Sequence, residues 1–161
     1  MTGVLITFHL ASFAFLGWAF WSGYSSTAVR AHIVIALGAT ALSVFSHCMT
    51  MMYVVAVGRM IRQTVEKAGL NQSYVAKTKG YRSKVFRAAT FAMVMVMLQT
   101  ILGGGAHTKA LPLWVHVVLG FLTMLLSSFA IFLEIHCLIG NHLLGHQAAR
   151  EFEKTTKTPR H

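Results

Sequence analysis

The stretch AHIVIALGATALSVFSHCMTMMYVVAVGRMI, residues 31–61, contains no charged side chain before Arg59. An α-helix needs about 20 apolar residues to cross the hydrocarbon core of a bilayer, so this stretch is long enough to span it. With about 100° of rotation per residue, its small and polar side chains fall on one narrow face of that helix. That face carries His32, Ala36, Ala39, Ser43, His47 and Thr50. Because ionisable groups are costly in lipid, we expect this face to point into a helix bundle.

The composition of the whole chain indicates an integral membrane protein. It has 161 residues, of which 55% are hydrophobic and only 11% are charged, and this balance is untypical of a soluble domain. The net charge of +10 does not indicate nucleic-acid binding, because the basic residues lie between and after the apolar runs. The two cysteines, Cys48 and Cys137, lie in apolar helical sequence, so a structural disulfide is not expected.

Apolar runs predict four membrane spans, at about residues 4–24, 31–57, 88–104 and 113–138. We therefore expect an all-α, four-transmembrane-helix bundle in which residues 1–161 form a single integral membrane domain. Between the second and third spans, Gly69 predicts a C′ cap and Asn71 or Ser73 an N-cap, so both helices should extend beyond the membrane. The glycines Gly103–Gly105 are expected to end the third helix, and the fourth can continue to Phe152 as an amphipathic tail.

The distribution of basic residues predicts the orientation in the membrane. Of the 14 Lys and Arg residues, all but Arg30 and Lys109 lie in the segments 59–87 and 141–161. Because basic residues accumulate on the cytoplasmic side, we expect the basic loop 59–87, the tail 141–161 and both termini to be cytoplasmic. The expected location is a bacterial inner (cytoplasmic) membrane, with the chain as a multi-pass protein.

Two layers of paired histidines are expected inside this bundle. His32 and His116 each lie within the first turns of a helix that begins at the outer surface. His47 lies about 22 Å deeper than His32 along the second span, and His9 lies at a comparable depth on the first. Glu134 is the acidic residue within a span, on the same helix face as His116. We expect Glu134 to be buried beside a basic or hydroxyl partner and to act as a catalytic proton relay.

At the level of architecture, paired imidazoles beside small residues in four spans resemble the four-helix b-type cytochrome subunits that anchor quinone-linked oxidoreductases. Such bundles bind haem b between histidines of facing helices, which predicts His32 with His116 and His47 with His9 as ligands of haem iron. In the two-haem members of that group, each ligand helix carries both histidines at a regular spacing. Here His136 lies on the opposite face of its helix from His116, which departs from that pattern.

The two outer cations complete the predicted haem site. Arg30 and Lys109 are placed to pair with the propionates of an outer haem. The expected function is that of a small membrane subunit of an electron-transfer complex, which binds haem b, lines a quinone site or does both. Such a chain is a subunit of a membrane oxidoreductase rather than an enzyme on its own.

The alternative function is a non-catalytic accessory subunit that packs against larger membrane partners through its small-residue faces. Each histidine can equally be an interhelical hydrogen-bond partner with no further role. The expected partners are other membrane subunits or further copies of the chain, together with lipid, but not nucleic acid.

Two further groups of residues have the composition of metal sites. Sulfur ligands favour Cu(I), and the sulfur-rich segment comprises His47, Cys48, Met49, Met51 and Met52, with Met93, Met95 and Met97 on the third span. Residues two apart on a helix point to opposite sides, however, and methionine is common in apolar cores. His142 and His146 lie one turn apart and can share a zinc ion, but they offer only two ligands.

Overall fold

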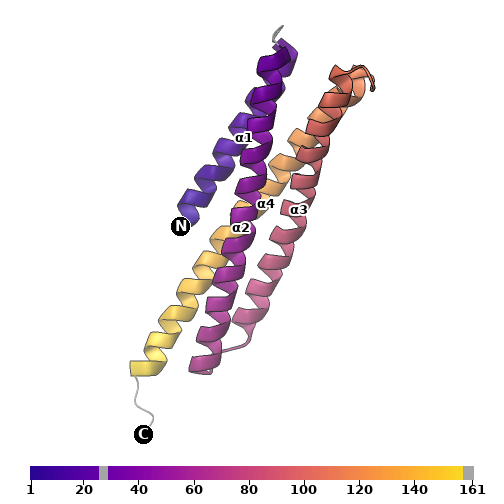
Figure 1. Cartoon of the computed structure of the whole chain (residues 1–161). Helices are drawn as coiled ribbons and strands as arrows, with labels where there is room; N and C mark the ends of the chain where they lie inside the picture. The colour runs from indigo at the N-terminus through magenta and orange to yellow at the C-terminus, as the bar shows by residue number, and fades with distance from the viewer. Residues whose placement is uncertain (26–28, 158–161) are drawn as a thin grey trace.

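The computed structural model describes residues 1–25 and 29–157, which form four helices (Figure 1). These are α1 (Thr2–Ser25), α2 (Val29–Ala68), α3 (Ser73–His107) and α4 (Leu113–Lys157). Each is long and apolar enough to cross a membrane, so the expected all-helical architecture with four such helices is confirmed. Residues 26–28, between the first two expected spans, and residues 158–161 of the expected tail lie outside the described residues.

Three of the helices are much longer than a bilayer requires. About 20 residues cross the hydrocarbon core, whereas α2, α3 and α4 contain 40, 35 and 45 residues. Figure 1 shows the N-terminus of α1 partway along the bundle, with the other three helices continuing past it toward the end of α4. Among the described residues the backbones of α1 and α3 do not approach each other closely, and each of these two helices packs against α2 and α4.

The connection between α2 and α3 is short and follows its capping signals only in part, because the N-cap residue of α3 is Gln72 and not the predicted Asn71 or Ser73. Gly69 follows the last residue of α2 and has a φ of 62°. The Leu70 N–H donates to the Val65 carbonyl at 3.1 Å, which is the bond that closes a Schellman cap. The Asn71 side chain then accepts a 2.8 Å hydrogen bond from the Ser73 N–H at the start of α3. Residues 59–87, the basic segment that was expected to form a cytoplasmic loop, are therefore helical except at this connection.

The glycines Gly103–Gly105 do not end α3, which continues beyond them. Glycine in a helix interior costs about 1 kcal/mol relative to alanine, so a compensating contact is expected here. A Cβ atom at Gly103 would lie 2.8 Å from Cε1 of His116, and one at Gly105 would lie 3.0 Å from Cδ1 of Leu111. The glycines therefore allow other parts of the chain to approach the α3 backbone closely.

Polar side chains gather inside the bundle and apolar ones lie outside. The buried polar residues include His9, Ser12, Ser43, Ser46, His47, Thr50, Thr123, Ser127, Glu134 and Asn141. Large apolar side chains such as Phe45, Leu125 and Phe132 are exposed on the outer surface. This arrangement suits a helix bundle surrounded by lipid, and it confirms that the small and polar face of α2 points inward.

Candidate functional site

A fully buried polar cluster joins His9 of α1, His47 of α2 and Glu134 of α4. Nδ1 of His47 lies 2.7 Å from Oε1 of Glu134. Nε2 of His9 lies 3.2 Å from Oε2 of the same carboxyl group. The two imidazole rings lie close together, with centroids 5.3 Å apart. Glu134 is thus buried beside basic partners, as its position on α4 predicted.

Hydroxyl groups of α2 hold the His9 ring in place. Its Nδ1 lies 3.0 Å from Oγ of Ser46, and its Nε2 lies 2.8 Å from Oγ1 of Thr50. The Ser12 hydroxyl donates to the His9 carbonyl at 3.0 Å. Both ring nitrogens of His9 therefore have partners, whereas Nε2 of His47 is buried without a hydrogen-bond partner among the described residues.

Three more buried hydroxyls line the interior between this inner cluster and the other end of the bundle. Ser43 lies one turn from His47 on α2, and Ser127 and Thr123 lie on the same face of α4 as Glu134. All three hydroxyls are buried without a hydrogen-bond partner in the part of the chain that the structure describes. The polar interior therefore extends from the inner cluster toward the outer histidines.

The second pair of imidazoles lies at the opposite end of the bundle, where α1 and α3 end and α2 and α4 begin. His32 of α2 and His116 of α4 are half-buried, and their ring centroids are 6.4 Å apart with the planes inclined by 75°. Nδ1 of His32 lies 3.1 Å from Oγ of Ser22 on α1. Nδ1 of His116 lies 3.1 Å from Nε2 of Gln99 on α3. The two predicted layers of paired histidines are therefore present, the inner pair from the consecutive helices α1 and α2 and the outer pair from α2 and α4.

Glycines make room for both outer rings. A Cβ atom at Gly23 would lie 2.7 Å from Cε1 of His32, and one at Gly103 would lie 2.8 Å from Cε1 of His116. Each ring thus packs directly on the backbone of a neighbouring helix, His32 on α1 and His116 on α3. These backbone contacts set the positions of the two imidazoles.

Replacing Gly103 by alanine is expected to displace the His116 ring, because carbon atoms pack at about 3.5–4.0 Å and not at 2.8 Å. Gly104→Ala is the matched control, since a Cβ at Gly104 meets nothing within 4 Å. Alanine favours a helix by about 1 kcal/mol over glycine. We therefore expect Gly104→Ala to raise the thermal unfolding midpoint in detergent and Gly103→Ala to lower it. A rise of the same size in both variants would contradict the close packing.

The other predicted haem-site residues lie outside both layers. Arg30 and Lys109 are exposed near the outer end, and Lys109 has a φ of 61° in the connection between α3 and α4. His136, which departs from the two-haem pattern, is exposed on α4. Arg30 and Lys109 are close in sequence to His32 and His116, but in the described part of the chain neither cation makes a hydrogen bond or ion pair with these imidazoles.

The sulfur-rich segment does not converge on one point. Met52 and Met97 are exposed on the bundle surface. Cys48 contacts Met93, with 3.8 Å between the sulfur atoms, while His47 belongs to the inner cluster. Cys48 and Cys137 are both free.

His142 and His146 lie together on α4, with ring centroids 4.5 Å apart. The Tyr53 hydroxyl lies 3.5 Å from Nδ1 of His142 and 2.9 Å from the Thr2 hydroxyl. Among the described residues, no third His, Cys, Asp or Glu joins these two histidines at metal-binding distance. They remain a two-ligand pair.

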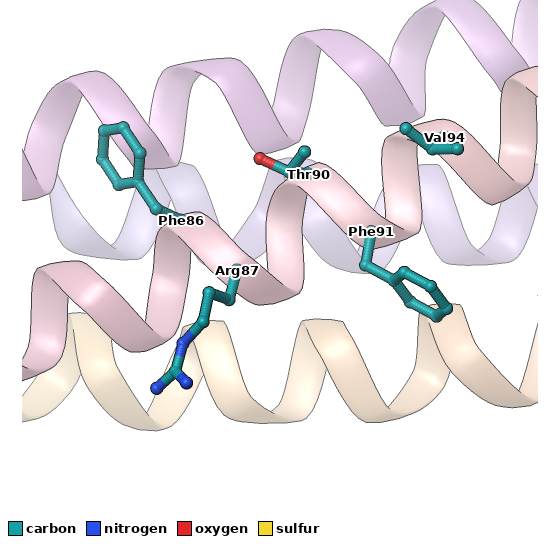
Figure 2. Close-up of a pocket in the computed structure, with 5 residues that line it drawn as sticks. All are labelled: Phe86, Arg87, Thr90, Phe91 and Val94. Carbon is teal, nitrogen blue, oxygen red and sulfur yellow. The ribbon is translucent and has the colours of Figure 1, made fainter.

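A hollow on the surface of α3 is separate from both histidine layers. Figure 2 shows its lining, which comes from α3 alone and consists of Phe86, Arg87, Thr90, Phe91 and Val94. These residues recur three or four apart along one face of the helix. Because the lining is mostly apolar and includes no typical metal ligand, the hollow suits a lipid chain or a neighbouring helix.

The convergence of Glu134 with His9 and His47 is the feature that sequence analysis missed. The rise per residue of a helix could have predicted that Glu134 and His47 lie at similar depth. Glu134 lies about 27 Å from His116 along α4, and His47 lies about 22 Å from His32 along α2. With His32 and His116 at one depth, these distances bring Glu134 to the depth of His47.

Comparison of the chain with protein-family models, curated proteins and solved structures finds no match. The arguments for function therefore rest on the two histidine layers themselves.

Proposed function

We propose that this chain is a haem-b-binding subunit of a membrane electron-transfer complex, with His32 and His116 as the axial ligands. The observation that carries the proposal is the 6.4 Å between their ring centroids. Two imidazoles on opposite sides of one metal ion, with metal–nitrogen bonds of about 2 Å, have ring centres roughly 6 Å apart. The ligands also come from two different helices, as in other bundle proteins that hold a cofactor in the core.

Hydrogen bonds on His32 support ligation through Nε2. The Ser22 hydroxyl donates to the Ala19 carbonyl at 2.9 Å, so its oxygen is left to accept the proton of Nδ1 of His32. This tautomer places the lone pair of His32 on Nε2, where a metal ligand needs it.

Gln99 can impose the same tautomer on His116. Its Oε1 is buried without a partner among the described residues, while its Nε2 contacts both Nδ1 and the carbonyl of His116 at 3.1 Å. Rotation of the Gln99 side-chain amide breaks its hydrogen bond to the His116 carbonyl. It also brings Oε1 of Gln99 to Nδ1 of His116, so that Oε1 accepts the proton on Nδ1. Nε2 of His116 is then free to bind iron.

The inner layer suits a second haem less well, so the proposal is restricted to one haem. Glu134 contacts both His9 and His47, and the ring centroids are only 5.3 Å apart. A porphyrin between these rings would have to displace the carboxyl group.

A reduced-minus-oxidised absorbance spectrum of the purified full-length chain tests the proposal. We expect b-type bands and, from a pyridine haemochrome assay, one haem per chain. A folded, helical preparation that is colourless after expression with ample haem would refute the proposal. That result would favour the accessory-subunit alternative, for which the apolar hollow on α3 offers a packing surface.

We further propose that the basic end of the bundle faces the cytoplasm, with the outer histidines toward the opposite side. A groove between α2 and α3 at this end is lined in part by the cations Arg59, Arg62, Lys79 and Arg82. Cytoplasmic leaflets carry anionic lipids that attract such clusters. Basic residues near membrane spans are in general retained on that side.

Cysteine labelling in intact bacterial cells checks this orientation. In a background with Cys48 and Cys137 replaced by alanine, Thr108→Cys is expected to react with a membrane-impermeant maleimide, and Gln72→Cys only after lysis. Both sites are exposed, so each reports the side of the membrane on which it lies. Labelling of Gln72→Cys alone in intact cells would reverse the topology.

A further inference from the structure

The inner cluster has the composition of a metal site that is independent of haem. We propose that His9, His47 and Glu134 bind a single divalent transition-metal ion, Zn²⁺ or Fe²⁺. Their ligand atoms all lie within 4.8 Å of one another, and the three side chains are fully buried. Within residues 1–25 and 29–157, no other three His, Cys, Asp or Glu side chains meet this spacing.

The distances suit an ion that enters with small side-chain movements. Metal–ligand bonds of about 2.0–2.2 Å place two ligands of a tetrahedral ion roughly 3.4 Å apart. Oε2 of Glu134 lies 3.2 Å from Nε2 of His9, which already matches that separation. Oε1 lies 2.7 Å from Nδ1 of His47, at hydrogen-bond distance. Replacing this hydrogen bond by two metal bonds requires the pair to separate by roughly 0.7 Å.

The donor set determines the kind of ion. Two imidazoles with one carboxylate occur in zinc enzymes and in non-haem Fe²⁺ sites. Mg²⁺ and Ca²⁺ prefer oxygen ligands, and Cu(I) prefers sulfur. Three protein ligands also leave at least one coordination position open, as catalytic sites of both metals do.

The surroundings of the cluster support a bound cation. Oε2 of Glu134 is buried without a hydrogen-bond partner among the described residues, although Nε2 of His9 lies 3.2 Å from it, so this carboxylate oxygen is available to a cation. A carboxylate in a membrane interior is costly unless a positive charge accompanies it. Ser46 lies 3.0 Å from Nδ1 of His9, where second-shell partners lie in metal sites. Nε2 of His9 lies 3.2 Å from the carboxyl group and 2.8 Å from the Thr50 hydroxyl, so a metal ion bound at Nε2 would replace the contact with Thr50.

Metal analysis of the purified full-length chain tests this proposal. We expect about one equivalent of zinc or of non-haem iron per chain by mass spectrometry, with haem iron measured separately by the pyridine haemochrome assay and subtracted. After chelation, Co²⁺ should rebind and give visible d–d absorption, and added Zn²⁺ should remove that absorption. Zinc and non-haem iron contents distinguish the two candidate metals.

Three variants connect the metal to these residues. Glu134→Gln preserves side-chain volume and His47→Ala removes an imidazole, and we expect each to lower Co²⁺ affinity at least 10-fold. His136→Ala, at an exposed histidine of the same helix, is expected to bind Co²⁺ as the wild type does. If His47→Ala does not fold, the Co²⁺ affinities of Glu134→Gln and of the wild type are compared to test the site.

Two outcomes would refute the proposed metal site. A wild-type chain that binds neither Co²⁺, Zn²⁺ nor Fe²⁺, or a Glu134→Gln chain that binds Co²⁺ with unchanged affinity, refutes the site. The cluster would then hold a proton between the carboxyl group and a histidine. This test does not depend on the outer haem, because a colourless chain can still bind Co²⁺ and a haem-loaded Glu134→Gln chain can still fail to do so.

Discussion

Replacing either His32 or His116 by alanine is expected to abolish the b-type absorbance of the chain, and replacing both is expected to remove no more. In the proposed site each imidazole would supply one bond to the haem iron, and the 6.4 Å between ring centroids is close to the roughly 6 Å expected for two imidazoles that share one metal ion. Residues that act as one unit show this non-additivity. The measurement is the reduced-minus-oxidised spectrum of each purified variant at equal protein concentration.

Two histidines elsewhere serve as controls for the outer pair. His136→Ala should leave the spectrum unchanged, because this side chain is exposed on α4. His47→Ala should also retain the bands, because His47 lies about 22 Å below His32 along the helix axis. Undiminished bands in both outer variants, or loss of the bands only in His47→Ala, would place the haem elsewhere.

Glu134→Ala is expected to lower the free energy of unfolding of the metal-free chain by about 3–5 kcal/mol. The substitution removes the group that contacts both His9 and His47, and it leaves two imidazoles in a fully buried site with fewer partners. It also leaves a cavity where the carboxyl group was. Denaturant titration in detergent with a chelator present measures the effect without a contribution from bound metal.

Glu66→Ala is the control for the Glu134 prediction. Glu66 pairs with Arg62 at 2.8 Å one turn away on α2, but both side chains are exposed, at 55% and 69%. Exposed ion pairs of this kind add little stability, so the transition of Glu66→Ala should coincide with that of the wild type. Coincident transitions for Glu134→Ala and Glu66→Ala would show that the buried cluster does not stabilise the fold.

The helical architecture could be predicted from local sequence. Spans follow from apolar runs of sufficient length, and the end of α2 follows from Gly69, whose φ of 62° is the conformation that a C′ glycine supplies. The inward face of α2 follows from the spacing of its small and polar residues, of which Ser43, His47 and Thr50 are fully buried. Each of these features depends on residues within a few positions of one another along the chain.

The local composition of the sequence predicted the wrong end for α3. Gly103–Gly105 has the composition of a helix stop, yet α3 continues through it. Packing accounts for glycine at Gly103, because the His116 ring lies where a Cβ of Gly103 would lie. His116 belongs to another helix, so the sequence around the glycines contained no sign of it.

The sequence by itself determined that four apolar helices exist, and it assigned the histidines to an outer and an inner depth. Only the tertiary structure decided that Glu134 meets His9 and His47, and that Ser22 and Gln99 contact the outer pair. The depth of a residue follows from its position in the chain, because each residue of a helix adds the same rise along the helix axis. The rotation of each helix about its axis and its distance from its neighbours follow from how side chains of different helices interlock. That packing depends on all four helices together, so the contacts within each histidine layer are determined only when the helices assemble.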